Sequence, residues 1–376
     1  LITLKSTCIP SKVMIELLVS PLTKTLSTCG KFIKVFITFF ELDDVDLRVI
    51  KPESYGSALA YFTGSKAHNI RIREIAMKNG LKINEYGVFN EKNNKKIAGE
   101  NEEEIYQILA LPFIVPELRE DRGEIEVAKN NNLPNLVELS EINGDLHVHT
   151  VWSDGGNSIE EMIKDAQKRG YKYLAICDHS QSLKIAGGLS EEKLVEQIKK
   201  IKELNEKYKN FTILAGSEVD IKADGSLDYP DELLKKLDIV VAAIHTRFRR
   251  SRYEMTKRII KAIQNPHVNI LAHPTGRLLG VRDAYEVNLD EILKVAKINK
   301  IALEINAFPE RLDLNDINCR KAKEYGVMIS INTDSHITNQ LDYMALGVSV
   351  ARRGWLEPEN IINTKPIEQI IKFLKS

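Results

Sequence analysis

The chain has 376 residues, of which 43% are hydrophobic and 28% are charged, the composition of an ordinary globular protein. Lys and Arg together number 53, as do Asp and Glu, so no overall positive charge attracts nucleic acid, and such binding would require a local patch. The most apolar short run, Phe36–Phe40, is far too short to cross a membrane. The four Cys lack paired spacing, which argues against a disulfide framework and fits a reducing cytoplasm.

The first 143 residues predict a small α/β region followed by a linker. A run of alternating charged and apolar residues predicts a strand over 43–50, and a helix is expected over 69–78, ending before Gly80. Turn-forming residues at 84–87 and 93–94 indicate a hairpin, and residues 98–121 are expected to be helical before two prolines turn the chain. Residues 125–143 are polar, with three successive asparagines, and predict a linker.

From residue 144 the pattern changes to short apolar runs that alternate with amphipathic stretches, in seven repeats of about 30 residues. Such repeats predict parallel strands joined by crossover helices. No GxGxxG motif follows the first strand, which favours a closed or nearly closed barrel over an open dinucleotide-binding sheet. The expected strands are 145–149, 173–177, 212–217, 239–244, 268–272, 301–305 and 327–332, and the expected helices are 159–169, 191–208, 231–236, 253–264, 289–298, 315–325 and 367–374.

Potential metal ligands stand at the end of nearly every predicted strand. Because the carboxyl ends of parallel barrel strands converge on one face, these side chains are expected to meet there. Asp154 follows the first pair by five residues, and imidazoles and carboxylates so grouped suit divalent metals. The residues at the strand ends are His147, His149, Asp178, His179, Glu218, His245, His273, Glu304, Asn306, Asp334 and His336.

The second part of the chain resembles the PHP (polymerase and histidinol phosphatase) domain, a distorted barrel of seven β/α repeats, over residues 144–376. The matching motifs are 145–150, 178–180, 216–220, 273–277, 303–306 and 332–336, and 226–230 with 311–314 resemble the PHP module fused to bacterial family X DNA polymerases. The resemblance implies three metals: one held by His147, His149, Glu218 and Asp334, which would be the catalytic set, a second by Glu218, His245 and His273, and a third by Asp154, His179 and His336.

The first part resembles the end of the polymerase region of family X enzymes, through residues 45–49, 61–65, 68–69, 84–87 and 116–120. This resemblance implies a truncated palm remnant at 1–50, a thumb-like domain at 51–124 and a linker at 125–143. Asp46 matches the third metal-binding carboxylate of the palm, but the first two are missing, so we expect no polymerase activity and interpret Asp46 as a solvated carboxylate. The start at Leu1 rather than Met suggests a fragment.

Mixed histidine and carboxylate ligation suits Zn, Mn or Fe rather than Mg or Ca alone. Two or three clustered divalent ions would activate water and stabilise the charge that develops when a phosphate ester is hydrolysed, so neither Ser nor Cys is needed as nucleophile. Cys177 stands where Thr is more usual in the family, which raises the question of oxidation or adventitious metal binding.

Arginines near the predicted strand ends are candidates for binding the substrate. Arg247, Arg249 and Arg250 follow His245 and could grip a nucleic-acid backbone, with Phe248 available for base stacking; the alternative is a solvated loop with ordinary salt bridges. Arg277 and Arg311 are candidate phosphate clamps. The two histidines outside the constellation, His68 and His267, are expected to be structural.

Three functions remain open from the sequence. The resemblance implies a phosphodiesterase that trims DNA 3′ ends in the cytoplasm, with single-stranded DNA or 3′ ends as its partner and no membrane. The alternatives are a phosphatase for a small monoester such as histidinol phosphate, and a non-catalytic, metal-stabilised remnant of a broken polymerase gene. The arginine-rich loop and the thumb-like region favour the first, the complete ligand set argues against the third, and the truncated front end argues for it.

Overall fold

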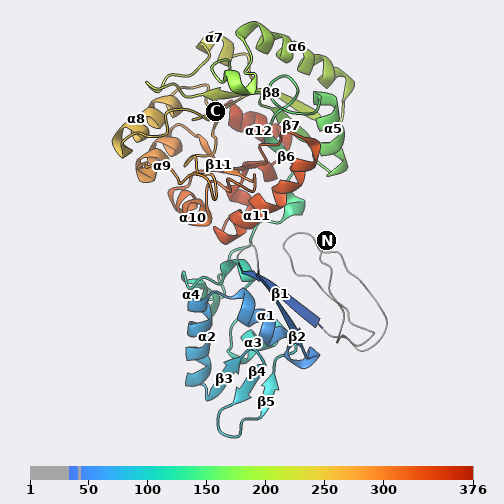
Figure 1. Cartoon of the computed structure of the whole chain (residues 1–376), viewed down its shortest axis with the longest axis vertical. Helices are drawn as coiled ribbons and strands as arrows, with labels where there is room; N and C mark the ends of the chain where they lie inside the picture. The colour runs from blue at the N-terminus through green and yellow to red at the C-terminus, as the bar shows by residue number, and fades with distance from the viewer. Residues whose placement is uncertain (1–33, 41–43, 376) are drawn as a thin grey trace. The chain divides into compact units, whose positions relative to one another are not determined.

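The computed structural model describes residues 34–40 and 44–375, and the chain divides into two compact units, residues 1–133 and 134–376 (Figure 1). Within the described part of the chain, no helix combines the length and apolar character needed to cross a membrane. Side chains are described from residue 49 onward, so the side chain of Asp46 and most of the expected palm remnant at 1–50 lie outside the description.

Unit 1 is a small α/β unit. Strands β1 (Lys34–Phe40) and β2 (Asp44–Ile50) pair antiparallel. A three-stranded antiparallel sheet contains the predicted hairpin, since β3 (Leu81–Asn84) turns directly into β4 (Gly87–Asn90), which also pairs with β5 (Lys96–Ala98). The helices of the unit are α1 (Tyr55–Thr63), α2 (Lys66–Lys78), α3 (Glu102–Ile108) and α4 (Glu124–Lys129).

Buried polar groups connect the helices of unit 1. Nδ1 of His68 on α2 lies 2.6 Å from Glu124 on α4, and Nε2 lies 3.1 Å from the hydroxyl of Tyr106 on α3. Arg119 is fully buried and donates to Glu102 at 2.7 Å. A buried charge is tolerated when it is paired and hydrogen-bonded in this way. His68 therefore contributes to the packing of unit 1.

The expected linker at 125–143 is split between the units. Residues 125–129 belong to helix α4, and the boundary between the units lies after Leu133. Residues 134–143 pack on unit 2: Val137 and Ile142 are buried in its hydrophobic core, and Val137 N donates to Leu356 O at 3.1 Å. The two apolar side chains account for this docking, because the burial of each removes apolar surface from water.

Unit 2 is a nearly closed barrel of seven parallel strands that neighbour one another in chain order, which confirms the predicted fold class. The first and last strands meet at a seam, where His149 N donates to Ser335 O at 2.8 Å and Asp334 N donates to His147 O at 3.0 Å. The strands are β6 (Gly144–Val148), β7 (Tyr173–Ile176), β8 (Thr212–Asp220), β9 (Ile239–Ala243), β10 (Ile270–Leu271), β11 (Ala302–Asn306) and β12 (Ile329–Asn332).

Helices surround these strands (Figure 1). The strands are buried on both faces, which explains why their sequences are almost continuously apolar rather than alternating. The helices are α5 (Ile159–Lys168), α6 (Glu191–Lys207), α7 (Asp231–Leu234), α8 (Arg252–Ile263), α9 (Leu289–Ile298), α10 (Asp316–Tyr325), α11 (Met344–Arg353) and α12 (Ile367–Leu374).

Helix α11 was not predicted. Its sequence contains valines and a glycine, which are weak helix formers, so tertiary packing decides its conformation. Gly347 lies so close to β12 that an added Cβ would meet Cγ2 of Ile331 at 2.5 Å. The glycine therefore allows the helix to approach the sheet, at a cost in intrinsic helix propensity.

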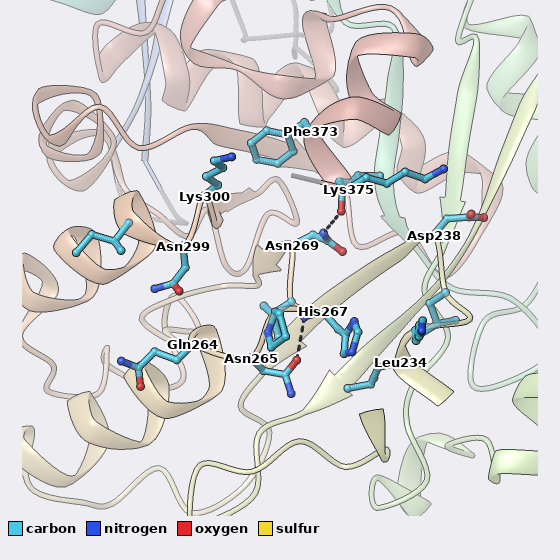
Figure 2. A pocket seen from close by; sticks show the side chains of 16 residues that line it. Leu234, Asp238, Gln264, Asn265, His267, Asn269, Asn299, Lys300, Phe373 and Lys375 are labelled. Carbon is cyan, nitrogen blue, oxygen red and sulfur yellow. Dashed lines mark hydrogen bonds between the residues drawn. The ribbon is translucent and has the colours of Figure 1, made fainter. Parts of the chain in front are cut away.

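Helix α12 covers the N-terminal ends of the strands, where Ile370 is buried in the cluster of side chains that fills the barrel. Beside it lies a hollow of about 740 Å³ at the start of β9, β10 and β11, lined by His267, Asn269 and Lys300 among others (Figure 2). The polar groups of Asn269 are used within the fold, since it accepts from Val240 N and donates to Leu374 O. His267 thus lies at the opposite end of the strands from the other histidines of unit 2.

Candidate metal centre

The carboxyl ends of the strands bring the predicted ligands together. His147 and His149 stand two residues apart at the end of β6, so their side chains lie on the same side of the strand. Their Nε2 atoms are 3.2 Å apart, and Nε2 of His149 lies 3.0 Å from Oδ1 of Asp334, which follows β12. All three side chains are buried and offer ligand atoms within 4.8 Å of one another.

Glu218 on β8 lies among histidines from several strands. Its Oε1 lies 2.9 Å from Nε2 of His273 and 3.2 Å from Nε2 of His245, while its Oε2 lies 2.9 Å from Nδ1 of His179. The same Oε2 is 3.5 Å from Nε2 of His147. The carboxylate is 1% exposed, so one buried anion faces imidazoles from both sides.

Asp154 stands at the more exposed side of the cluster. Its carboxylate lies 3.4 Å from Nε2 of His336 and 3.5 Å from Nε2 of His179. The loop that carries it is held by the buried carboxylate of Asp178, which accepts from Thr150 N at 2.8 Å and from the hydroxyl of Ser153 at 2.5 Å. Asp178 therefore holds the loop and does not face the ligand groups.

Three groups of potential ligands follow from these distances: His149, Asp154, His179 and His336; His147, His149 and Asp334; and His179, Glu218 and His245. This grouping differs from the partition implied by the family resemblance, because His149 stands beside Asp154 and His179 stands beside Glu218. His273 joins through its 2.9 Å contact with Glu218. All nine expected ligands are thus brought together, in groups that share members.

Several potential ligand atoms of the cluster lack hydrogen-bond partners within the protein and are suited to bind divalent ions. Nδ1 of His149, His179 and His273 and Oδ1 of Asp334 are buried without a hydrogen-bond partner in the described structure. The contacts of His179 with Glu218 and of His149 with Asp334 are short, but neither satisfies these atoms as a hydrogen bond. Buried polar atoms without partners are costly, and a bound cation would satisfy them.

The electrostatics of the site agree with this interpretation. Burial alone would raise the pKa of Glu218, but the charges of His245, His147 and His179 hold it well below its usual range. Burial alone would lower the pKa of His179 and His245, but Glu218 raises them to about 10 and about 9. Burial and the neighbouring His179 lower the pKa of His149 to about 3. Protons on some imidazoles thus balance the buried carboxylates when no metal is bound.

Two further carboxylates orient the histidines. Glu304 on β11 lies 2.8 Å from Nδ1 of His147 and accepts from His273 N at 2.7 Å. Asp220 lies 2.9 Å from Nδ1 of His245. A carboxylate on the second ring nitrogen of a ligand histidine determines its tautomer and orientation. Sequence reasoning grouped Glu304 with the strand-end ligands and did not single out Asp220, although Asp220 stands two residues after Glu218 and so on the same side of β8.

Comparison with known proteins gives the family. The model of the PHP domain matches residues 145–308, and that of the DNA polymerase beta thumb matches residues 58–120. A probable phosphatase of Thermoanaerobacter sp. is 31% identical over 242 residues, which cover 61% of this chain and 94% of the phosphatase. The chain belongs to the PHP family.

The PHP domain of this chain follows a polymerase-type thumb, as in bacterial family X polymerases. The DNA polymerase/3′-5′ exonuclease PolX of Bacillus subtilis is 43% identical over 367 residues, which are 97% of this chain and 64% of the Bacillus protein. Among solved structures, the histidinol phosphate phosphatase of Lactococcus lactis, complexed with Zn, L-histidinol and phosphate, is 18% identical with a TM-score of 0.43, covering 56% of this chain and 94% of the phosphatase.

The predicted substrate arginines of the PHP domain occupy different settings. Arg247 and Arg249 are exposed and Arg250 is half-buried, and all three line a groove beside Phe248. Within the described part of the chain, none of the three forms an ion pair with a carboxylate, although Glu254 lines the same groove and the charge of Arg250 contributes to lowering the pKa of Glu254.

Arg311 stands beside the metal cluster of the PHP domain, and Arg277 stands beside the loop that carries Arg311. Nε of Arg311 lies 3.5 Å from Oδ2 of Asp334, beside the cluster. Arg277 donates Nε to the carbonyl of Arg311 at 2.8 Å and Nη2 to the carbonyl of Leu312. Two of the donors of Arg277 therefore hold the loop that carries Arg311, and its role as a phosphate clamp stays a prediction.

Cys177 lies inside the barrel of the PHP domain and is fully buried. Its thiol donates to the carbonyl of Leu146 at 3.4 Å, and burial raises the pKa of the thiol well above its usual range. Because the thiolate is the form that binds metals and reacts with oxidants, both burial and the raised pKa disfavour oxidation and metal binding at Cys177.

Proposed function

We propose that this PHP domain is a metal-dependent phosphoesterase that hydrolyses phosphodiester bonds at DNA 3′ ends. The observation that carries the proposal is the cluster of nine ligand residues at the carboxyl ends of the barrel strands, next to a groove of unpaired arginines. The similarity to a Bacillus protein named as a polymerase and 3′-5′ exonuclease supports DNA as the substrate, as does the thumb in the same chain. The chain covers only part of that protein, so its other activities are not transferred.

We assign His147, His149, Asp154, His179, Glu218, His245, His273, Asp334 and His336 as ligands of two or three divalent ions, Zn, Mn or Fe. Bound ions would supply Lewis acidity for the hydrolysis of a phosphate ester. Glu218 would serve two ions at once, because its two oxygens face different histidines. The buried strands hold these side chains in place, which keeps the site preorganised.

The arginines have separate roles in this proposal. Arg311 stands beside Asp334 and would donate to a phosphoryl oxygen of the scissile group. Arg247, Arg249 and Arg250 would bind backbone phosphates of the DNA, and Arg277 would keep the loop of Arg311 in place. We place the activity in the cytoplasm, where the free thiols of Cys177 and Cys319 remain reduced.

A second candidate is a phosphatase for small monoesters, because the Thermoanaerobacter relative is named as a probable phosphatase. The groove of arginines favours DNA over a small ester, since such a row of cations suits several phosphates.

The deciding experiment compares 3′-labelled single-stranded DNA with histidinol phosphate, using the purified chain loaded with Zn, Mn or Fe. Metal-dependent shortening of the DNA from its labelled end, with a rate that falls steeply as salt rises, is the expected result. Faster hydrolysis of histidinol phosphate would favour the second candidate. A chain that binds the ions and cleaves neither substrate would support a non-catalytic role.

A further inference from the structure

The groove beside the metal cluster contains an arginine that the sequence did not single out. The groove has a volume of about 950 Å³ and is lined by Arg247, Arg249, Arg250, Phe248, Tyr285 and Arg282, among others. Arg247 follows His245, a residue of the cluster, by two positions, so the groove opens next to the metal ligands. Arg282 follows the turn at residues 278–281 and lies 34 residues after Phe248 in the sequence.

Two independent contacts hold the guanidinium group of Arg282. Its central carbon lies 3.8 Å from the centre of the Phe248 ring, a stacking contact. Its Nε and Nη2 both donate to the carbonyl of Gly276, at 3.0 and 2.7 Å. The ring of Phe248 lies nearly parallel to that of Tyr285, with 6.3 Å between centres and 19° between planes. The orientation of the guanidinium plane is therefore fixed by the Phe248 ring on one face and by the Gly276 carbonyl at one edge.

The backbone around Arg282 is held as well. Arg282 N donates to Leu278 O at 2.7 Å, and Leu278 N donates back to Arg282 O at 2.8 Å. Leu279 N donates to the carbonyl of Glu310, one residue before Arg311. The turn that carries Arg282 is thus tied to the loop that carries Arg311, on the rim of the metal cluster.

The charge of Arg282 lacks a counter-ion. Among the residues that the structure describes, no carboxylate forms an ion pair with Arg282. Burial and the nearby charge of Arg311 lower the pKa of Arg282 from its usual value. Glu254 and Asp283 also line the groove, so its four arginines outnumber its two carboxylates. This excess of positive charge suits a negatively charged ligand.

We propose that Arg282 is a base-stacking residue: its guanidinium plane supports the nucleobase next to the scissile phosphate, while Arg247, Arg249 and Arg250 bind the adjacent backbone phosphates. Phe248 covers one face of the guanidinium, and Arg282 lines the groove. Stacking of bases on guanidinium planes is an established mode of nucleic-acid recognition. The inference rests on the proposed function, and it revises the expected role of Phe248, which supports Arg282 instead of contacting the base itself.

The test uses the full chain and the variant Arg282→Lys, which keeps the positive charge and removes the plane. A short single-stranded DNA carries 2-aminopurine at its last or its next-to-last position, and binding is measured in EDTA so that no hydrolysis occurs. The wild-type chain is expected to change the 2-aminopurine fluorescence at one of the two positions. The variant is expected to lose most of that change while it retains salt-dependent binding of the DNA.

Hydrolysis gives the second readout, in the metal-loaded chain. The wild type is expected to cleave a DNA with normal bases at its last two positions about tenfold faster, in kcat/KM, than the same DNA with abasic residues there, a ratio within the range of one base–side-chain stack. Arg282→Lys should reduce this ratio towards one. Phe248→Leu, which removes the support beneath the guanidinium, should give an intermediate ratio.

Arg320→Lys is the matched control, because the Arg320 guanidinium lies 4.0 Å from the ring centre of Trp355 on the same barrel. It should leave both readouts unchanged. Equal fluorescence changes in the wild type and Arg282→Lys, or an unchanged ratio in the variant, would overturn the base-stacking role. Stacking without any DNA cleavage would instead contradict the proposed function and leave the base-stacking role standing.

Discussion

Oε1 of Glu218 lies 2.9 Å from Nε2 of His273, and both side chains are 1% exposed. The other oxygen of this carboxylate lies 2.9 Å from His179 on the opposite side. One buried anion thus lies between two sets of imidazoles, the arrangement of a ligand that bridges two cations.

Glu218→Gln keeps the side-chain volume and removes the negative charge. Two unit charges about 4 Å apart interact by about 4 kcal/mol at an effective dielectric of ~20, so cations at this spacing need an anion between them. We expect fewer metal ions per chain, measured by inductively coupled plasma mass spectrometry. We also expect the rate of hydrolysis to fall by about a hundredfold or more. Far-UV circular dichroism should change little. His267→Ala, at the other end of the strands, should keep metal content and rate (Figure 2).

Full metal content and activity in Glu218→Gln would contradict the bridging role and remove the main support for the proposed function.

Asp220→Asn tests how His245 is oriented. The carboxylate lies 2.9 Å from Nδ1 of His245, and its replacement by an amide weakens the preference for one tautomer and one ring orientation. We expect metal affinity to fall by about ten- to a hundredfold, measured by competition with a chelator. Asp224→Asn, a change of the same kind at an exposed site on the loop after β8, should have no effect. Equal affinities in the two variants would show that Asp220 has no orienting role.

Metal binding should release protons. The buried carboxylate of Glu218 raises the pKa of His179 to about 10 and that of His245 to about 9, against the effect of burial, so both imidazoles carry protons at neutral pH when no metal is bound. Ions must displace these protons, and apparent affinity should therefore rise between pH 6 and pH 9. Calorimetric titrations in buffers of different ionisation enthalpy measure the number of protons released. A pH-independent affinity would contradict this picture.

Glu124 should make the stability of unit 1 depend on pH in the acidic range. Burial by itself raises the pKa of Glu124, but the hydrogen bond with His68 and those from the backbone of residues 121 and 122 outweigh it, so the net pKa is lowered. A lowered folded pKa gives stability that is present above the unfolded value of about 4.3 and is lost as pH falls through the folded value. Glu124→Gln should remove this dependence and deprive His68 of its carboxylate hydrogen-bond partner, which costs about 1–3 kcal/mol.

Hydrogen exchange of residues 66–78 in the full chain, between pH 4 and pH 7, measures the effect on α2. Equal protection in the wild type and Glu124→Gln across this range would contradict the prediction.

The boundary between the units predicts how unit 2 should be truncated. Val137 and Ile142 are buried in the core of unit 2, and full burial of such a side chain contributes about 1.5–3 kcal/mol. A chain that begins at residue 134 should therefore be more stable to urea than one that begins at residue 144, although both contain all nine metal ligands. Indistinguishable unfolding midpoints would mean that residues 134–143 do not contribute to the domain.

The sequence by itself determined the type of barrel and the residues that gather in it. Short apolar runs that alternate with amphipathic stretches specify parallel strands and helices locally, and the ends of six of the seven strands agree with prediction to within one residue; β8 continues to Asp220. Because parallel strands place their carboxyl ends on one face, the ligand positions in sequence were enough to predict a cluster.

Only the tertiary structure decided which ligand residues of the cluster lie next to one another and which carboxylates orient the histidines. The position of His179 between Glu218 and Asp154 depends on the loops that follow different strands. Arg282 stacks on Phe248, 34 residues earlier in the chain, and no local sequence pattern predicts such a contact. Periodicity records which face of an element is buried, whereas the direction of a side chain in a loop depends on partners that only the folded chain brings near it.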